Sequence, residues 1–167
     1  MQALLLLLSA PPDALRLLLF TIRLLPIPPS TTSDVDTLYR MELVAACVEA
    51  TEDRLERYLC AKIPRFESSY RVDIGRCEVK GAAGEVTAWQ ILPRSAAERA
   101  RLCRSMVEDA RVAIERIRES RGACRHLPKA EQLALYTRGR CDSDEAKRLS
   151  RVRWPYEHEV RAVESAE

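Results

Sequence analysis

Apolar residues recur at intervals of three and four between residues 34 and 153, which is the spacing of one face of an α-helix. The clearest helix lies between Ser105 and Gly122, where a Ser-x-x-Glu capping box starts it and the glycine stops it. Its apolar stripe consists of Val107, Ala110, Ile114 and Ile117. Similar signals predict further helices beginning near residues 34, 53, 95, 128 and 143. We therefore expect a mainly α-helical domain.

The helical period fails between Tyr70 and Thr87. Just before this stretch, Pro64 is expected to bend or restart the helix that begins near residue 53. Within the stretch, apolar residues alternate or nearly do, at Val72, Ile74, Cys77 and Val79, and three glycines punctuate the run. Alternation between glycines predicts a small β-hairpin at about residues 72–86. The expected fold class is thus mainly α with one small hairpin.

Residues 1–29 differ from the rest of the chain. A leucine run at 4–8 is followed by small, turn-prone residues and by a second apolar run at 15–25, which contains Arg16 and Arg23. A spanning helix needs about 20 uninterrupted apolar residues, so we expect none here. Three interpretations stay open: a secretory signal peptide without the usual basic start, an amphipathic helix on a membrane surface, or an apolar helix packed on the domain.

The remaining organisation is simple. Residues 30–33 end a proline- and serine-rich linker, the domain proper occupies 34–153, and 154–167 are expected to form a charged C-terminal tail. A length of 167 residues suits one domain, and a net charge of +2 gives no strong nucleic-acid signature. We expect a monomer with no cofactor and no nucleic-acid partner.

The chain has six cysteines, an even set that allows 15 pairings. They are Cys47, Cys60, Cys77, Cys103, Cys124 and Cys141. A zinc site is a poor explanation of these cysteines, because there is no Cys-x-x-Cys pair and neither His126 nor His158 has a second histidine at ligand spacing. Disulfides in an oxidising compartment are favoured, and the alternative is six buried, reduced thiols.

Cys103 and Cys124 are not expected to pair with each other. The helix predicted between them holds its ends about 25 Å apart, whereas a disulfide needs a Cα separation of about 5.5 Å. At least two of the six are expected to be paired with other partners. The expected disulfides, together with the apolar N-terminal segment, favour an exported protein.

The candidate chemistry begins with Glu67, in the stretch Ile-Pro-Arg-Phe-Glu-Ser-Ser-Tyr at residues 63–70. Glu67 follows an apolar helical stretch, so its side chain could leave the helix end into a partly dry cleft. Desolvation there would favour the protonated carboxyl group that a general acid needs. The alternative is a solvated glutamate at a helix end.

Two later stretches change this picture. Residues 84–93 read Gly-Glu-Val-Thr-Ala-Trp-Gln-Ile-Leu-Pro, and residues 133–139 read Leu-Ala-Leu-Tyr-Thr-Arg-Gly. With the first stretch, and in this order, they resemble the lytic transglycosylase and goose-type lysozyme superfamily. That superfamily carries Glu-Ser-x-Phe/Tyr, then Gly-x-x-Gly-Leu-Met-Gln-Ile-x-Pro, then Ala-x-Tyr-Asn-x-Gly. The resemblance covers about residues 35 to 150 and departs at Thr87, where glycine is usual, and at Ala88, Trp89 and Thr137.

The resemblance implies a lysozyme-like fold and peptidoglycan glycan strands as substrate. By carry-over, Glu67 is the single acid and base, and Tyr136 reaches it through the phenolic hydroxyl. Gln90 would bond substrate or backbone, Trp89 would stack on a sugar, and Ser68 would bind substrate or cap the helix. Each of these four also has a purely structural interpretation.

A hydrolytic lysozyme would need a second carboxylate, for which Glu85 and Asp73 are the candidates. Three function classes therefore stay open. They are a peptidoglycan-cleaving enzyme, a catalytically inactive lysozyme-like domain that binds glycan or a partner, and a disulfide-stapled structural or membrane-attached helical protein.

Overall fold

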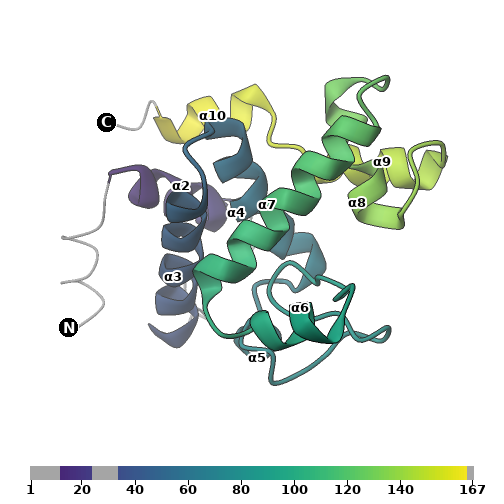
Figure 1. Ribbon diagram of the computed structural model, residues 1–167. Helices are drawn as coiled ribbons and strands as arrows, with labels where there is room; N and C mark the ends of the chain where they lie inside the picture. Colours follow the sequence, from purple (N-terminus) through teal and green to yellow (C-terminus); the bar gives the residue numbers. More distant parts are fainter. Residues whose placement is uncertain (1–11, 24–33, 165–167) are drawn as a thin grey trace.

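The computed structural model describes residues 12–23 and 34–164, and over these residues the chain is helical (Figure 1). The expected mainly α-helical class is confirmed. The helices are Pro12–Arg23 (α2), Asp34–Ala50 (α3), Arg54–Glu67 (α4), Val72–Gly75 (α5), Ala96–Arg101 (α6), Met106–Ala123 (α7), Ala134–Arg138 (α8), Asp144–Arg153 (α9) and Glu157–Glu164 (α10), with a 3-10 turn at Lys129–Glu131 (η2).

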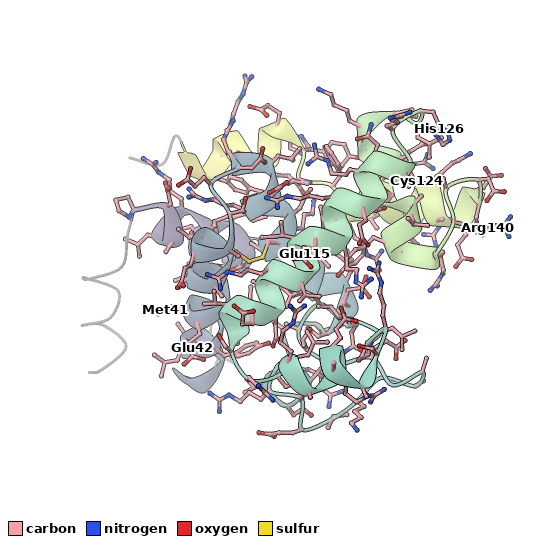
Figure 2. The ribbon with its side chains drawn as sticks, in the orientation of Figure 1. Met41, Glu42, Glu115, Cys124, His126 and Arg140 are labelled. Carbon is pink, nitrogen blue, oxygen red and sulfur yellow. A yellow bond between two sulfur atoms is a disulfide. The ribbon has the colours of Figure 1, made fainter. Side chains whose placement is uncertain are left out.

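The core lies between α3, α4 and α7, and Figure 1 shows α7 crossing the other two diagonally. The stripe expected on α7 faces this core: Ala110, Ile114 and Ile117 are buried, and Val107 is partly buried. The helix continues one residue past the expected stop at Gly122. Glu115 lies on its outward face (Figure 2).

Residues expected as caps precede α4, α6, α7 and α9, but at Ser105, before α7, the expected side-chain hydrogen bond of the capping box is absent. Asp53, Ser95 and Ser143 each accept a hydrogen bond from the backbone N–H three residues later. Asp53 and Glu56 have the spacing of a capping box, but the Glu56 side chain does not accept from the Asp53 N–H, which donates to the Thr51 hydroxyl. The Glu56 side chain turns instead to Arg118, whose guanidinium binds both of its carboxylate oxygens at 2.8 and 2.7 Å.

The β-hairpin expected at residues 72–86 is wrong. Residues 72–75 form α5, and the described part of the chain contains no strand, only one antiparallel bridge between Val86 and Ile91. The backbone closes helical turns here, because the Gly75 N–H donates to the Arg71 carbonyl at 3.0 Å and the Arg76 N–H donates to the Val72 carbonyl at 2.9 Å. Positive φ angles at Cys77 and Gly84 then interrupt the extended backbone that a regular ladder needs.

Both flanking helices belong to the same core as the domain expected at 34–153. In α2, Leu17 and Phe20 are buried, and the Phe20 ring meets Tyr58 edge-on at 4.9 Å. Of the three interpretations of the N-terminal segment, residues 12–23 match the helix packed on the domain. Residues 1–11 and the linker at 30–33 lie outside the described residues. No helix among the described residues is long and apolar enough to cross a membrane.

The C-terminal segment, expected as a charged tail, is helical over α10. Its Val160 is buried in the core, as is Trp154 just before the helix. This buried anchor places the segment in the fold rather than in solvent.

All six cysteines form disulfides: Cys47–Cys60, Cys77–Cys103 and Cys124–Cys141, with Cα separations of 5.8, 5.9 and 5.5 Å. This confirms pairing and the exclusion of Cys103 with Cys124, and the alternative of six reduced thiols is wrong. Cys124 caps the end of α7, where the chain turns past His126 toward α8 (Figure 2). Disulfides of this number indicate folding in an oxidising compartment.

Asp109, in the first turn of α7, gives the fold a pH dependence. Its side chain is buried and accepts a hydrogen bond from the Cys103 N–H at 2.9 Å. Burial, with a smaller contribution from Glu108, raises the pKa of Asp109 to about 6, although the Cys103 N–H opposes the rise. The folded chain therefore holds this proton more tightly than the unfolded chain does.

The contribution of protonated Asp109 to the free energy of unfolding should therefore be fully present below about pH 4. It should be lost as the pH rises through about 6. Asp109→Asn keeps an acceptor for Cys103 but cannot ionise. Between pH 4 and pH 7, the free energy of unfolding of this variant should rise relative to wild type by up to about 3 kcal/mol. Urea unfolding at a series of pH values measures the difference. If the free energies of unfolding of the two proteins changed in parallel with pH, Asp109 would not be the source of the pH dependence.

Candidate functional site

A cleft of about 520 Å³ brings together residues from all three of the sequence stretches that resemble the transglycosylase superfamily. Glu67 comes from the end of α4, Glu85 and Gln90 from the loop before α6, and Tyr136 from α8. The full lining is Glu67, Glu85, Gln90, Ile91, Leu92, Arg94, Arg116, Glu119, Leu135, Tyr136, Thr137, Arg138 and Gly139. These stretches are far apart in sequence, so the fold and not the chain order creates the cleft.

The cleft is assembled around Pro64, which lies inside α4. Proline has no N–H, so it leaves the carbonyl of Cys60, four residues earlier, without its helical partner. The indole Nε1–H of Trp89 donates to that carbonyl at 2.8 Å. The interruption in α4 thus becomes the acceptor that docks the loop carrying Glu85 and Gln90.

Trp89 also contacts the third stretch. The phenolic hydroxyl of Tyr136 donates to the Trp89 carbonyl at 2.9 Å, and the Tyr136 N–H donates to the hydroxyl of Ser120 on α7 at 3.0 Å. Ser120 in turn donates to the Gln132 carbonyl at 2.8 Å. Burial, and next the nearby Glu67 carboxylate, raises the pKa of the Tyr136 phenol, which keeps it a hydrogen-bond donor.

The Tyr136 hydroxyl was expected to orient Glu67. This prediction is wrong, because the hydroxyl donates to the Trp89 carbonyl instead. Arg153, the last residue of α9, takes the place beside Glu67. Its Nε–H donates to Oε1 of Glu67 at 2.8 Å, and the two side chains are 9% and 20% exposed. Glu67 is thus a half-buried carboxylate held by an almost buried guanidinium.

Glu85 and Gln90 lie together against Gly81. A Cβ atom at Gly81 would be 2.3 Å from Oε2 of Glu85 and 2.7 Å from Oε1 of Gln90, so a larger residue there would displace the ends of these two side chains. The Gln90 amide donates to the Thr87 carbonyl at 3.1 Å, and Glu85 accepts from the Ala83 N–H at 3.0 Å. Backbone contacts therefore fix both side chains at the wall of the cleft.

Three expected site residues do not line the cleft. Trp89 is buried, so it cannot stack on a sugar, and Ser68 is buried with its hydroxyl donating to the Pro64 carbonyl at 3.0 Å. Asp73, on α5, pairs with Arg71 just before that helix, and the hydrogen bonds from Arg71 lower the pKa of Asp73. Glu85 is accordingly the only one of the two proposed second carboxylates in the cleft lining.

Sequence reasoning did not find Arg153, nor the charged pair of Arg94 and Glu119 that lines another part of the cleft. Arg153 lies 86 positions from its partner and matches no motif. Among the described residues, no group of three His, Cys, Asp or Glu side chains could hold a metal ion.

Comparisons of the chain with family models, with curated proteins and with solved structures give no match. The resemblance to the transglycosylase superfamily therefore depends on the three short stretches and on the cleft that their residues share.

The link between Pro64 and Trp89 can be tested by a double-mutant cycle. Trp89→Phe keeps the buried ring but removes the donor for the Cys60 carbonyl, so it should lower the free energy of unfolding by roughly 1–3 kcal/mol. Pro64→Ala supplies a backbone N–H to the same carbonyl. In that background, the cost of Trp89→Phe measured by chemical denaturation should be clearly smaller. Equal costs in the two backgrounds would mean that the carbonyl is not what joins the loop to α4.

Proposed function

We propose that this protein is a peptidoglycan lytic transglycosylase that cleaves the β-1,4 bond between MurNAc and GlcNAc with Glu67 as its single acid and base. The observation that carries the proposal is the meeting of Glu67, Gln90 and Tyr136, each from a different stretch, in one cleft. The cleft volume of about 520 Å³ lies within the usual range of ligand sites.

The backbone at Thr87 supports the same proposal. Thr87 has φ +69°, in the left-handed region that favours glycine, and glycine is the residue that the superfamily usually carries there. The neighbouring Gln90 has φ +49°. The turn before the Gln-Ile-x-Pro stretch thus keeps a conformation suited to glycine although a β-branched residue occupies it.

In this mechanism Glu67 gives its proton to the glycosidic oxygen as the bond from C1 of MurNAc breaks. The resulting carboxylate then takes the proton of the C6 hydroxyl, whose oxygen closes the 1,6-anhydro ring on C1. The proton taken replaces the proton given, so no second carboxylate is needed. Oxygen Oε2 of Glu67 has no hydrogen-bond partner among the described residues, which leaves it for these transfers.

Two alternatives have specific support. Glu85 lines the same cleft, so a hydrolytic lysozyme of the same fold would use it to position water. The ion pair between Glu67 and Arg153 also supports a catalytically inactive domain that only binds glycan, because pairing with a nearly buried arginine gives Glu67 a structural role that needs no proton transfer.

We further propose that the protein is exported to the periplasm or the cell exterior, encoded by a bacterium or a phage, and monomeric. Three disulfides support export. Contact between residues 1–25 and a membrane surface is also proposed, and the exposed Leu19 and Ile22 of α2, 44% and 47% accessible, support it.

Glu67→Gln should abolish cleavage of purified peptidoglycan in a protein that still folds but is less stable, because the Arg153 charge loses its carboxylate partner. Glutamine keeps an oxygen for Arg153 but cannot exchange a proton, so the rate should fall by about 10²- to 10⁴-fold or more. Mass analysis of the digest detects the anhydro products of the wild type. Full activity in Glu67→Gln would rule out this mechanism.

Glu85→Gln separates the transglycosylase from the hydrolase. A transglycosylase should tolerate this change, whereas a hydrolase that positions water should lose as much activity as with Glu67→Gln. Digestion in ¹⁸O-labelled water reports the same distinction, because only hydrolysis incorporates solvent oxygen. Asp73→Asn is the matched control, since Asp73 is not part of the cleft lining. A wild type that binds peptidoglycan without cleaving it would favour the binding domain.

A further inference from the structure

Arg153 is held from several sides, and each contact limits where its guanidinium can lie. Its Nη1 donates to the Leu149 carbonyl of its own helix at 3.1 Å. Its guanidinium carbon lies 5.5 Å from the centre of the Phe66 ring, the residue next to Glu67. With Nε on Glu67, the planar group is fixed at an angle that a lysine could not reproduce.

The end of α9 is also fastened to α4 independently of Arg153. Lys62, one and a half turns before Glu67 on α4, donates from Nζ to the Trp154 carbonyl at 2.8 Å and to the Glu159 carboxylate at 2.6 Å. The Lys62 side chain is 4% exposed. The backbone that carries Arg153 is therefore already in place beside Glu67.

We propose that Arg153 is a positioning residue for the acid and base, an inference that depends on the proposed transglycosylase function. It holds oxygen Oε1 of Glu67 and so keeps Oε2 in the orientation required for both proton transfers. A glutamate side chain at a helix end has three rotatable bonds, and one fixed oxygen removes most of this freedom before substrate binds.

The charge of Arg153 acts in the second half of the reaction. Once Glu67 has given its proton to the leaving oxygen, it is an anion, and the guanidinium at 2.8 Å stabilises that anion until the C6 hydroxyl returns a proton. Arg153 itself neither gains nor loses a proton, and it does not line the cleft.

The test uses the full chain, soluble peptidoglycan fragments and two variants. Arg153→Met keeps an apolar stem against Phe66 but removes the donor, and Arg153→Ala leaves a space for a small guanidinium ion. We expect kcat to fall by up to about 10²-fold in both, with KM changed less than about twofold, because orientation and not binding is lost. Millimolar guanidinium should restore part of the kcat of Arg153→Ala.

Arg151→Ala is the matched control, because Arg151 belongs to the same helix but pairs with Glu131 and is 47% exposed. It should leave kcat unchanged and show no response to guanidinium. Thermal melts of all variants confirm folding, and Arg153→Met carries the test if Arg153→Ala does not fold.

The outcomes separate the two proposals. If wild type cleaves, Glu67→Gln is inactive and folded Arg153→Met keeps its kcat, the transglycosylase proposal stands and the role of Arg153 is overturned. A fall in kcat without rescue in a folded Arg153→Ala would also overturn it, because the defect would then not be the missing guanidinium. If wild type cleaves nothing, both proposals fall together.

Discussion

The missing N–H of Pro64 is the constraint on which the rest of the site depends. A proline inside α4 leaves the Cys60 carbonyl in a dry core without its helical partner, and an unpaired buried carbonyl is costly. The Trp89 indole removes that cost. A neighbouring carbonyl on α4, that of Ala61, is similarly bonded by the buried Tyr70 hydroxyl at 2.8 Å. Two aromatic donors thus fix the chain that follows Glu67 to α4, and the one from Trp89 replaces the N–H that Pro64 lacks.

Trp89 also connects the other walls of the cleft through hydrogen bonds. Its carbonyl accepts from Tyr136, whose backbone is held by Ser120 on α7, so one buried residue connects α4, the loop and α8. The disulfide between Cys60 and Cys47 links α3 to α4 at the residue whose carbonyl Trp89 binds. A cleft wall built mainly from loop residues is stiff here because its hydrogen bonds end on helices, and helices deform less than loops.

Local signals in the sequence predicted local structure well. Caps such as Asp53 and Ser143, and the stripe on α7, depend on neighbours within one or two turns, so periodicity and capping chemistry were enough. The hairpin was predicted wrongly because alternating apolar residues reveal neither the helical turn at α5 nor the positive φ angle at Cys77. Four of the candidate site residues line the cleft, whereas Arg153 could not be found, since nothing near it in sequence signals a partner on α4.

The ion pair with Arg153 means that the presence of Glu67 is weaker evidence for catalysis than the sequence alone suggests. An arginine side chain that is 9% exposed would be left uncompensated without its carboxylate, and uncompensated buried charge is strongly destabilising. Glu67 therefore has a structural reason to be present as well as a chemical one, and its presence alone does not distinguish an enzyme from a binding domain. The two roles use different atoms, because Oε1 carries the ion pair and Oε2 has no partner among the described residues. A carboxylate with one oxygen engaged and one unengaged serves both roles at once, so an ion pair at this position is compatible with catalysis as long as the second oxygen stays accessible to the glycan.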